Sequence, residues 1–306
     1  MYSDSFQFLK KEIEASGADI RCVVMGSGES PQHRYDSHEY DAALHYPLFS
    51  VTKSIVSIAF GLVYDRLGPS VLERKILQDC TEIPIENPDP RRSELSYHHL
   101  LSQTSGIKWR EMGAKWGSGN PLWDMEHHHE WMSFILNREF SSVPGRHFNY
   151  SSGVSHLLPY LMGKLLEGDI CDILLEDLFF PLGIDRLEWE SDPQGNLSGG
   201  KGLSLRAEDL WKFGSLVAQE GKFRGRQVVS AEWIRLSTAK KARGLGYYGD
   251  YGYQWWIQSP EVVAAIGFGG QYLFIDKSRG LVAVFLGNLN KASFDLPRTL
   301  FEKLRK

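Results

Sequence analysis

Residues 49–63 read FSVTKSIVSIAFGLV, the most informative stretch of the chain. After Ser50 the residues are apolar almost all round a helical wheel, as in a helix buried inside a protein. Gly68 is a stop signal, so the pattern predicts a helix over 50–67. Ser50 stands at its start, where backbone N–H groups have no partner within the helix and can stabilise an oxyanion.

Ser50 and Lys53 form a Ser-x-x-Lys pair, and this spacing places both side chains on one helical face. Burial lowers the pKa of a lysine, so Lys53 could accept a proton near neutral pH. On local evidence the alternative is an ordinary N-cap serine beside a lysine that extends into solvent. The spacing also occurs at three places where glycine or a basic run follows: Ser105/Lys108, Ser198/Lys201 and Ser237/Lys240.

The elements around this helix predict an α+β fold with one sheet built from both ends of the chain. A helix over 4–16 and a strand over 21–25 come first. The middle of the chain has helical patterns and an aperiodic stretch at 108–126. The helical patterns cover 128–138, 153–166, 170–179 and 206–219; strand patterns at 252–258, 262–267, 271–276 and 281–287 precede a closing helix over 292–305.

Composition excludes several classes of partner. A net charge of -4 gives no basic field for nucleic acid. The 3 cysteines form no CxxC pair, which argues against a disulfide framework or a thiolate zinc site. The first residues lack a signal-peptide pattern, and no apolar run is long enough to span a membrane. We therefore expect a cytoplasmic protein without a membrane partner, and the sequence leaves its oligomeric state open.

Five stretches, in order, resemble the serine β-lactamases, the penicillin-binding proteins and their esterase and amidase relatives. The resemblance covers about residues 20–290. It implies a single two-lobed domain over 1–306, with a sheet lobe at 1–48 and 220–306 and a helical lobe at 49–219. The stretches are FSVTKS at 49–54, LLSQTSG at 100–106, PGRHFNYSSG at 144–153, GGKGL at 199–203 with the helix that follows, and GFGGQY at 267–272.

The resemblance also implies roles for individual residues. Ser50 would attack a carbonyl and form an acyl-enzyme, and Lys53 would take its proton. Tyr150 would share the base function, with its ionised form favoured by the lysine cation. The oxyanion hole would combine the N–H groups of Ser50 and Gln271, and no metal or other cofactor is expected.

Two departures from the family pattern concern the substrate. Ser152 stands where the family commonly has an asparagine that binds a substrate amide. Phe268, followed by Gly269 and Gly270, stands where a lysine or histidine commonly recognises a carboxylate, which phenylalanine cannot do. The aromatic-Gly-Gly pattern resembles the esterase branch, and Gly-Gln-Tyr resembles the aminohexanoate-dimer hydrolases.

Aromatic residues favour an apolar pocket. Trp109, Trp116 and Trp123 lie in the aperiodic stretch and are candidates for its wall, although they could also be core residues. Three consecutive histidines at 127–129 splay apart on a helix, so we expect no metal site there.

The sequence thus favours a serine hydrolase for a small uncharged ester or amide. A β-lactamase or D-alanyl-D-alanine peptidase is the alternative within the same chemistry. An alternative of another class is a non-catalytic binding protein that keeps the fold. Retention of Ser50, Lys53 and Tyr150 together argues against that last alternative.

Overall fold

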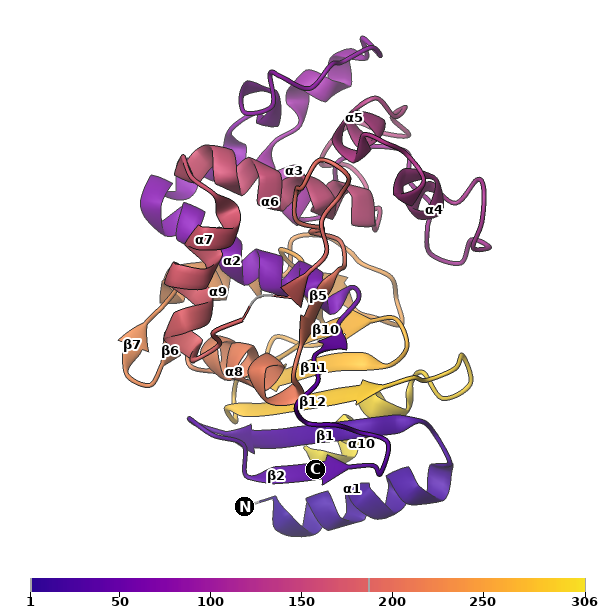
Figure 1. Cartoon of the computed structure of the whole chain (residues 1–306), viewed down its shortest axis with the longest axis vertical. Helices are drawn as coiled ribbons and strands as arrows, with labels where there is room; N and C mark the ends of the chain where they lie inside the picture. Colours follow the sequence, from indigo (N-terminus) through magenta and orange to yellow (C-terminus); the bar gives the residue numbers. More distant parts are fainter. Residues whose placement is uncertain (1, 187, 306) are drawn as a thin grey trace.

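The main sheet is built from both ends of the chain, as the sequence pattern predicts. The computed structural model describes residues 2–186 and 188–305. Seven antiparallel strands lie in the order β2-β1-β12-β11-β10-β9-β8 (Figure 1). Their bounds are Ile20–Ser27 (β1), His33–Asp36 (β2), Asp250–Tyr251 (β8), Trp256–Ile257 (β9), Val262–Gly267 (β10), Gln271–Asp276 (β11) and Leu281–Gly287 (β12).

The three strands β10, β11 and β12 match the predicted ranges to the residue. The predicted strand at 252–258 is interrupted, because Gln254 has a φ of 63°. This left-handed conformation bends the chain and lets the Gln254 N–H donate to the carbonyl of Leu101 in the helical lobe. Of the predicted range only β9 forms a strand, and β8 lies just before that range.

Helices cover both faces of the sheet. Helices α1 (Ser3–Ser16) and α10 (Leu296–Leu304), from the two chain ends, pack on one face. Helices α2 (Val51–Leu67) and α8 (Ala207–Ala218) pack on the other. Alternate residues of each strand enter the two cores, as the pleat of a strand requires.

Helix α8 was expected in the helical lobe but lies against the sheet. The contact with β12 is so close that a Cβ atom on Gly214 would lie 2.4 Å from the Val282 side chain. The face of α8 that carries Gly214 therefore packs on the sheet, and the helix is part of the sheet lobe. The rest of the range expected for the helical lobe forms helices and loops (Figure 1), together with the short strands β4 (Glu188–Trp189) and β5 (Leu203–Leu205).

The helical lobe consists of short helices around the longer α6 (Ser152–Leu166). The predicted helix at 170–179 is α7 (Ile170–Leu174) continued by a π-helical turn at Leu175–Phe179. The predicted helix at 128–138 starts later, because His128 Nδ1 accepts the N–H of Glu130 in a turn. The other lobe helices are α3 (Tyr97–Leu101), α4 (Pro121–Glu126) and α5 (Trp131–Leu136), with 3-10 turns at Pro69–Glu73, Ile76–Gln78, Pro90–Glu94 and Phe180–Leu182.

Helix α2 joins the two lobes, since it packs on β10, on α6 and on α9 (Ala231–Ser237). This position places Ser50, at the start of α2, where the lobes meet. Two small sheets complete the fold: β3 (Tyr46–Pro47), β5 (Leu203–Leu205) and β4 (Glu188–Trp189) form one, and β6 (Lys222–Phe223) and β7 (Arg226–Gln227) the other.

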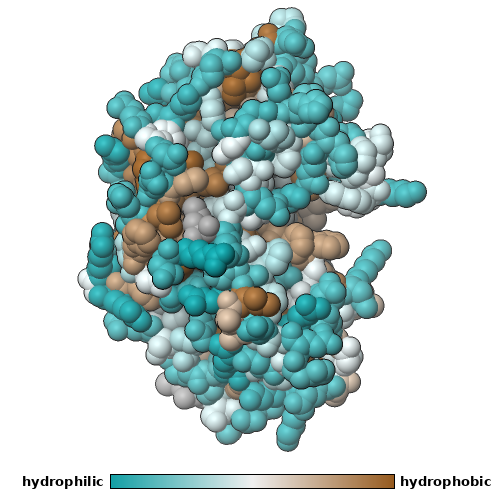
Figure 2. Space-filling model, in the orientation of Figure 1, coloured by the Kyte–Doolittle hydropathy of each residue, from teal (hydrophilic) through white to brown (hydrophobic). Residues whose placement is uncertain are grey.

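The face of the molecule in Figure 2 is covered mostly by hydrophilic residues, with smaller hydrophobic groups between them. Its outline is indented on the right, between the part that carries α4 in Figure 1 and the sheet below. In the described parts of the chain, no helix combines the length and apolarity needed to cross a bilayer.

Candidate active site

Ser50 and Lys53 lie in contact at the start of α2. Lys53 Nζ is 3.0 Å from Ser50 Oγ, and the Lys53 residue is only 1% exposed. The lysines of the other three Ser-x-x-Lys pairs instead form ion pairs near the surface: Lys108 with Glu139, Lys201 with Glu126 and Lys240 with Asp250. Burial therefore singles out the pair that the sequence favoured.

Lys53 has two further hydrogen-bond partners. Its Nζ donates to Ser152 Oγ at 2.9 Å and to the carbonyl of Gly200 at 2.7 Å. Burial lowers the pKa of Lys53 to about 8, although the nearby Glu111 carboxylate opposes this shift and Lys201 adds to it. A lysine with this pKa can take up and release protons near neutral pH.

The Gly199–Gly200 pair brings a carbonyl into the site. A Cβ atom on Gly199 would lie 2.3 Å from the Ser155 carbonyl, and one on Gly200 would lie 2.4 Å from the Ser152 carbonyl. Only glycine lets this segment approach the first turns of α6 so closely. The carbonyl of Gly200 thereby reaches Lys53.

Tyr150 lies in the site, as expected, but its surroundings favour the neutral hydroxyl. The Tyr150 ring centroid is 4.7 Å from Lys53 Nζ, and the Tyr150 hydroxyl pairs with the Ser50 side chain. Burial, followed by the charge of Glu111, raises the pKa of Tyr150 well above its ordinary value. Burial and the Glu111 charge thus outweigh the hydrogen bond with Ser50, and the shift is opposite to the favoured tyrosinate that the resemblance implied.

The structure places Gln271, the predicted second oxyanion donor, on β11 and not among the residues that line the pocket. Gln271 lies opposite Gly267 in the β10–β11 ladder, and its side-chain amide donates to the Gly287 carbonyl on β12. Gly267 and Phe268, in contrast, line the pocket beside Ser50. Within residues 2–186 and 188–305, neither the Ser50 nor the Phe268 backbone N–H donates to a protein acceptor.

The backbone just before Ser50 is strained. Phe49 has a φ of 48°, which is uncommon for a residue with a side chain and is found most often at functional sites. The Phe49 ring packs edge-on against Phe268, with the centroids 5.6 Å apart. This contact holds the start of α2 next to the β10–β11 turn.

Glu111 is the residue of the site that sequence reasoning missed. Its carboxylate accepts hydrogen bonds from Trp109 Nε1 (2.6 Å), from the Ser152 N–H (2.9 Å) and from Ser152 Oγ (2.8 Å). Glu111 lies in the aperiodic stretch at 108–126, outside the five motifs. No spacing pattern could have identified it.

The pocket in front of Ser50 has a volume of about 780 Å³ and mostly apolar walls. Trp116 and Phe268 line it, as predicted, whereas Trp109 packs in the core against Gly153 and Trp123 stacks on His127. Gly269 and Gly270 form the turn behind Phe268, with φ angles of 75° and 92°. The other apolar lining residues include Phe49, Met112, Leu122, Tyr248, Trp256, Ile266 and Phe294.

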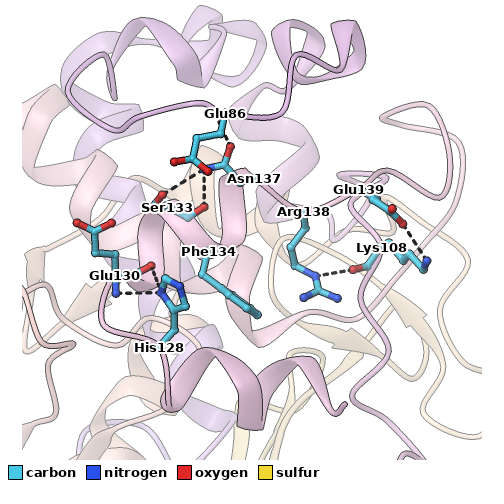
Figure 3. Close-up of a pocket in the computed structure, with 9 residues that line it drawn as sticks. All are labelled: Glu86, Lys108, His128, Glu130, Ser133, Phe134, Asn137, Arg138 and Glu139. Atoms are coloured by element: carbon cyan, nitrogen blue, oxygen red, sulfur yellow. Dashed lines mark hydrogen bonds and ion pairs between the residues drawn. The ribbon is translucent and has the colours of Figure 1, made fainter. Parts of the chain in front are cut away.

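A second pocket, of about 570 Å³, lies on the helical lobe away from Ser50 (Figure 3). Several of its polar side chains interact with one another or with nearby backbone. Lys108 pairs with Glu139, Arg138 donates to the Lys108 carbonyl, and Asn137 donates to Ser133. Ser50 lines the larger pocket and not this one, so the site around Ser50 is the candidate active site.

Comparison with known proteins agrees with this geometry. The beta-lactamase family model matches residues 13–304. The chain is 27% identical to the 6-aminohexanoate-dimer hydrolase of Paenarthrobacter ureafaciens over 254 residues, which cover 79% of this chain. The matched part is 59% of that relative, so the chain spans less than two thirds of its length.

Solved structures share the fold at low sequence identity. EstCE1, a hydrolase with promiscuous acyltransferase activity, superposes with a TM-score of 0.80 and 14% identity, covering 100% of this chain and 98% of EstCE1. A Bacillus anthracis protein assigned provisionally as a 6-aminohexanoate-dimer hydrolase superposes with a TM-score of 0.81 and 14% identity. The superposition covers 97% of this chain and 81% of the Bacillus anthracis protein.

Proposed function

Since the chain belongs to the beta-lactamase family, we propose that it is a serine hydrolase with Ser50 as nucleophile and Lys53 as base. One observation carries the proposal: the buried Lys53 Nζ, whose pKa is lowered to about 8, lies 3.0 Å from Ser50 Oγ. An amine so placed can take the serine proton as the oxygen attacks.

In the proposed acylation, Ser50 Oγ forms a bond to the substrate carbonyl carbon and its proton passes to Lys53 Nζ. The carbonyl oxygen becomes an oxyanion, which the N–H groups of Ser50 and Phe268 stabilise. When the intermediate collapses, the leaving alcohol or amine takes a proton from the neutral Tyr150 hydroxyl. Lys53 then passes the proton that it received from Ser50 to Tyr150. Water then attacks the acyl-enzyme, its proton returns through the same groups to Ser50, and the carboxylic acid leaves.

The pocket supports a small, uncharged ester or amide as the substrate. Phe268 stands where a carboxylate-binding cation would be needed, and Lys201, the lysine that lines the pocket, is paired with Glu126. The apolar walls suit an apolar acyl or leaving group. The similarity to the 6-aminohexanoate-dimer hydrolase of Paenarthrobacter ureafaciens favours including an amide among the substrates tested.

The first experiment measures turnover and intact mass with p-nitrophenyl butyrate, a p-nitroanilide amide and the β-lactam nitrocefin, for wild type and Ser50→Ala. We expect turnover of the ester or amide and its loss in Ser50→Ala. Faster turnover of nitrocefin would establish a β-lactamase instead. No turnover and no mass shift with any compound would support a binding protein and contradict the proposal.

A further inference from the structure

Glu111 lies behind the Ser50–Lys53 pair, joined to it through Ser152. We infer that Glu111 is a positioning residue that acts through the Ser152 hydroxyl to orient Lys53 toward Ser50. The inference rests on the proposed function, because it assigns how the base of that mechanism is held. It adds a carboxylate that lies outside the five stretches that resemble the family.

The direction of each hydrogen bond follows from the atoms available. A serine hydroxyl has one proton to donate, and Ser152 Oγ donates it to Glu111 Oε1 at 2.8 Å. Toward Lys53 Nζ, 2.9 Å away, Ser152 Oγ can therefore only accept. The carbonyl of Gly200, 2.7 Å from Nζ, is also only an acceptor.

These two acceptors fix the orientation of the neutral amine. A neutral lysine has two N–H protons, and the Ser152 and Gly200 oxygens take one each. The nitrogen lone pair is then left for the third neighbour, Ser50 Oγ, at 3.0 Å. This is the orientation that a general base needs to receive the Ser50 proton.

Glu111 is itself held in place as an acceptor. Trp109 Nε1 and the Ser152 N–H both donate to Oε2, while Oε1 faces the Ser152 hydroxyl. All three contacts come from N–H or O–H donors, which suits an ionised carboxylate. Trp109 is 2% exposed, so the carboxylate is fixed by a side chain that cannot move freely.

The same carboxylate acts on Lys53 through its charge. Burial is the largest influence and lowers the pKa of Lys53, whereas Glu111 raises it. Loss of the Glu111 charge should therefore lower the pKa of Lys53 further. A carboxylate that acted on Lys53 through its charge alone would lower the midpoint when removed without lowering kcat above that midpoint.

The test compares Glu111→Gln, Ser152→Ala and the double variant with wild type, and uses Glu139→Gln as the control. Glu139 is an exposed carboxylate paired with Lys108 in the other pocket, so its variant removes the same charge away from Ser50. Rates on p-nitrophenyl butyrate are measured from pH 6 to pH 10. The titration of Lys53 is followed by NMR of lysine-labelled protein, with the signal assigned from Lys53→Met.

We expect Glu111→Gln to lower the Lys53 midpoint by about 1 unit. We expect kcat to fall by about tenfold or more even above that midpoint, with little change in KM. The reason is that the new amide can donate to Ser152 Oγ, which frees the Ser152 proton to occupy the Lys53 lone pair. The double variant should be no slower than Ser152→Ala alone, because both changes interrupt one chain of hydrogen bonds.

An unchanged Lys53 midpoint and an unchanged kcat in Glu111→Gln would overturn the inference. So would rate losses of the two single variants that multiply in the double variant. A wild-type protein that turns over no ester or amide would instead contradict the proposed function. The NMR midpoints need no turnover, so in that case a lowered midpoint in Glu111→Gln still supports the coupling and an unchanged one still overturns it.

Discussion

Lys53 gives the reaction a defined pH dependence. The active form of a general base is the neutral one, and the pKa of Lys53 is lowered to about 8. At pH 7 about one tenth of the molecules then carry a neutral Lys53. We expect kcat/KM to rise about tenfold per pH unit below pH 8 and to level above it, in a profile on p-nitrophenyl butyrate. A plateau that already begins below pH 7 would contradict Lys53 as the base.

The Phe268 N–H can be tested although it belongs to the backbone. The Phe268 side chain is 75% exposed, so Phe268→Ala should fold and keep the N–H. Phe268→Pro removes that donor. We expect kcat to fall by roughly 100-fold in Phe268→Pro, as for loss of one oxyanion donor, and much less in Phe268→Ala.

Circular dichroism of both Phe268 variants controls for folding. Equal rates for the two variants, with both folded, would place the second oxyanion donor elsewhere. The comparison separates the N–H from the Phe268 ring, which contacts Phe49.

At the level of single residues, the sequence could identify groups that repeat a family pattern. Ser50, Lys53 and Tyr150 lie together as expected. The turn at Gly269 puts Gln271 on β11 and leaves Gly267 and Phe268 on the pocket wall, an arrangement that no motif specifies. Glu111 could not be found because its role arises only when the aperiodic loop folds against the start of α6.

Helix α6 connects element packing to the site. A Cβ atom on Gly153 would lie 2.4 Å from the ring of Trp109, whose Nε1 holds Glu111. We expect Gly153→Ala to lower the free energy of unfolding by about 1–3 kcal/mol, as overpacking does, and to reduce kcat as well. Thermal or urea unfolding and ester turnover measure the two effects.

Gly163→Ala, in the same helix, is the matched control. Its new Cβ would lie 3.3 Å from the nearest atom, the Gly168 carbonyl, and alanine favours helix formation by about 1 kcal/mol over glycine. We expect little change in stability or activity. If both variants behave alike, close packing on Trp109 is not what requires glycine at position 153.

Element boundaries were predictable where period and local chemistry agree. The strands β10, β11 and β12 are continuous apolar runs bounded by glycine or charged turns, and their predicted ends are those found. The strand at 252–258 could not be resolved, because the bend at Gln254 is stabilised by a hydrogen bond to Leu101, far away in the sequence. The sheet-facing role of α8 likewise depends on tertiary packing.

At the scale of the whole molecule, buried carboxylates tie distant segments together. Asp192 lies 3.0 Å from His156 Nε2 on α6 and accepts two hydrogen bonds from Asn196, which fixes the segment leading to Gly200. Asp276, at the end of β11, accepts a hydrogen bond from Arg305 at the end of α10. Each contact joins parts of the chain that would separate on unfolding.

These contacts make the stability of the molecule depend on pH. Burial raises the pKa of Asp192, but hydrogen bonds from His156 and Asn196 outweigh it, so the net pKa lies below the ordinary value. Burial of Asp276 is outweighed in the same way by Ser278 and Arg305. Below a pH of about 3.9, the ordinary pKa of aspartate, the unfolded chain therefore binds more protons than the folded chain does. The stability from both groups is present above that pH and is lost as the pH falls through their lowered folded values.

Asp192→Asn tests this dependence, because asparagine keeps the shape of the protonated acid and loses the charge. We expect the variant to lower the free energy of unfolding by about 1–3 kcal/mol at pH 7, where the wild-type carboxylate accepts charge-assisted hydrogen bonds. The difference should shrink toward pH 3, because below a pH of about 3.9 the unfolded wild-type chain takes up protons at Asp192, which favours unfolding. Urea unfolding followed by tryptophan fluorescence at both pH values measures it, with the exposed Glu29→Gln as a control that should match wild type throughout. A difference that stays constant with pH would mean that packing at position 192, and not its charge, stabilises the segment beside Lys53.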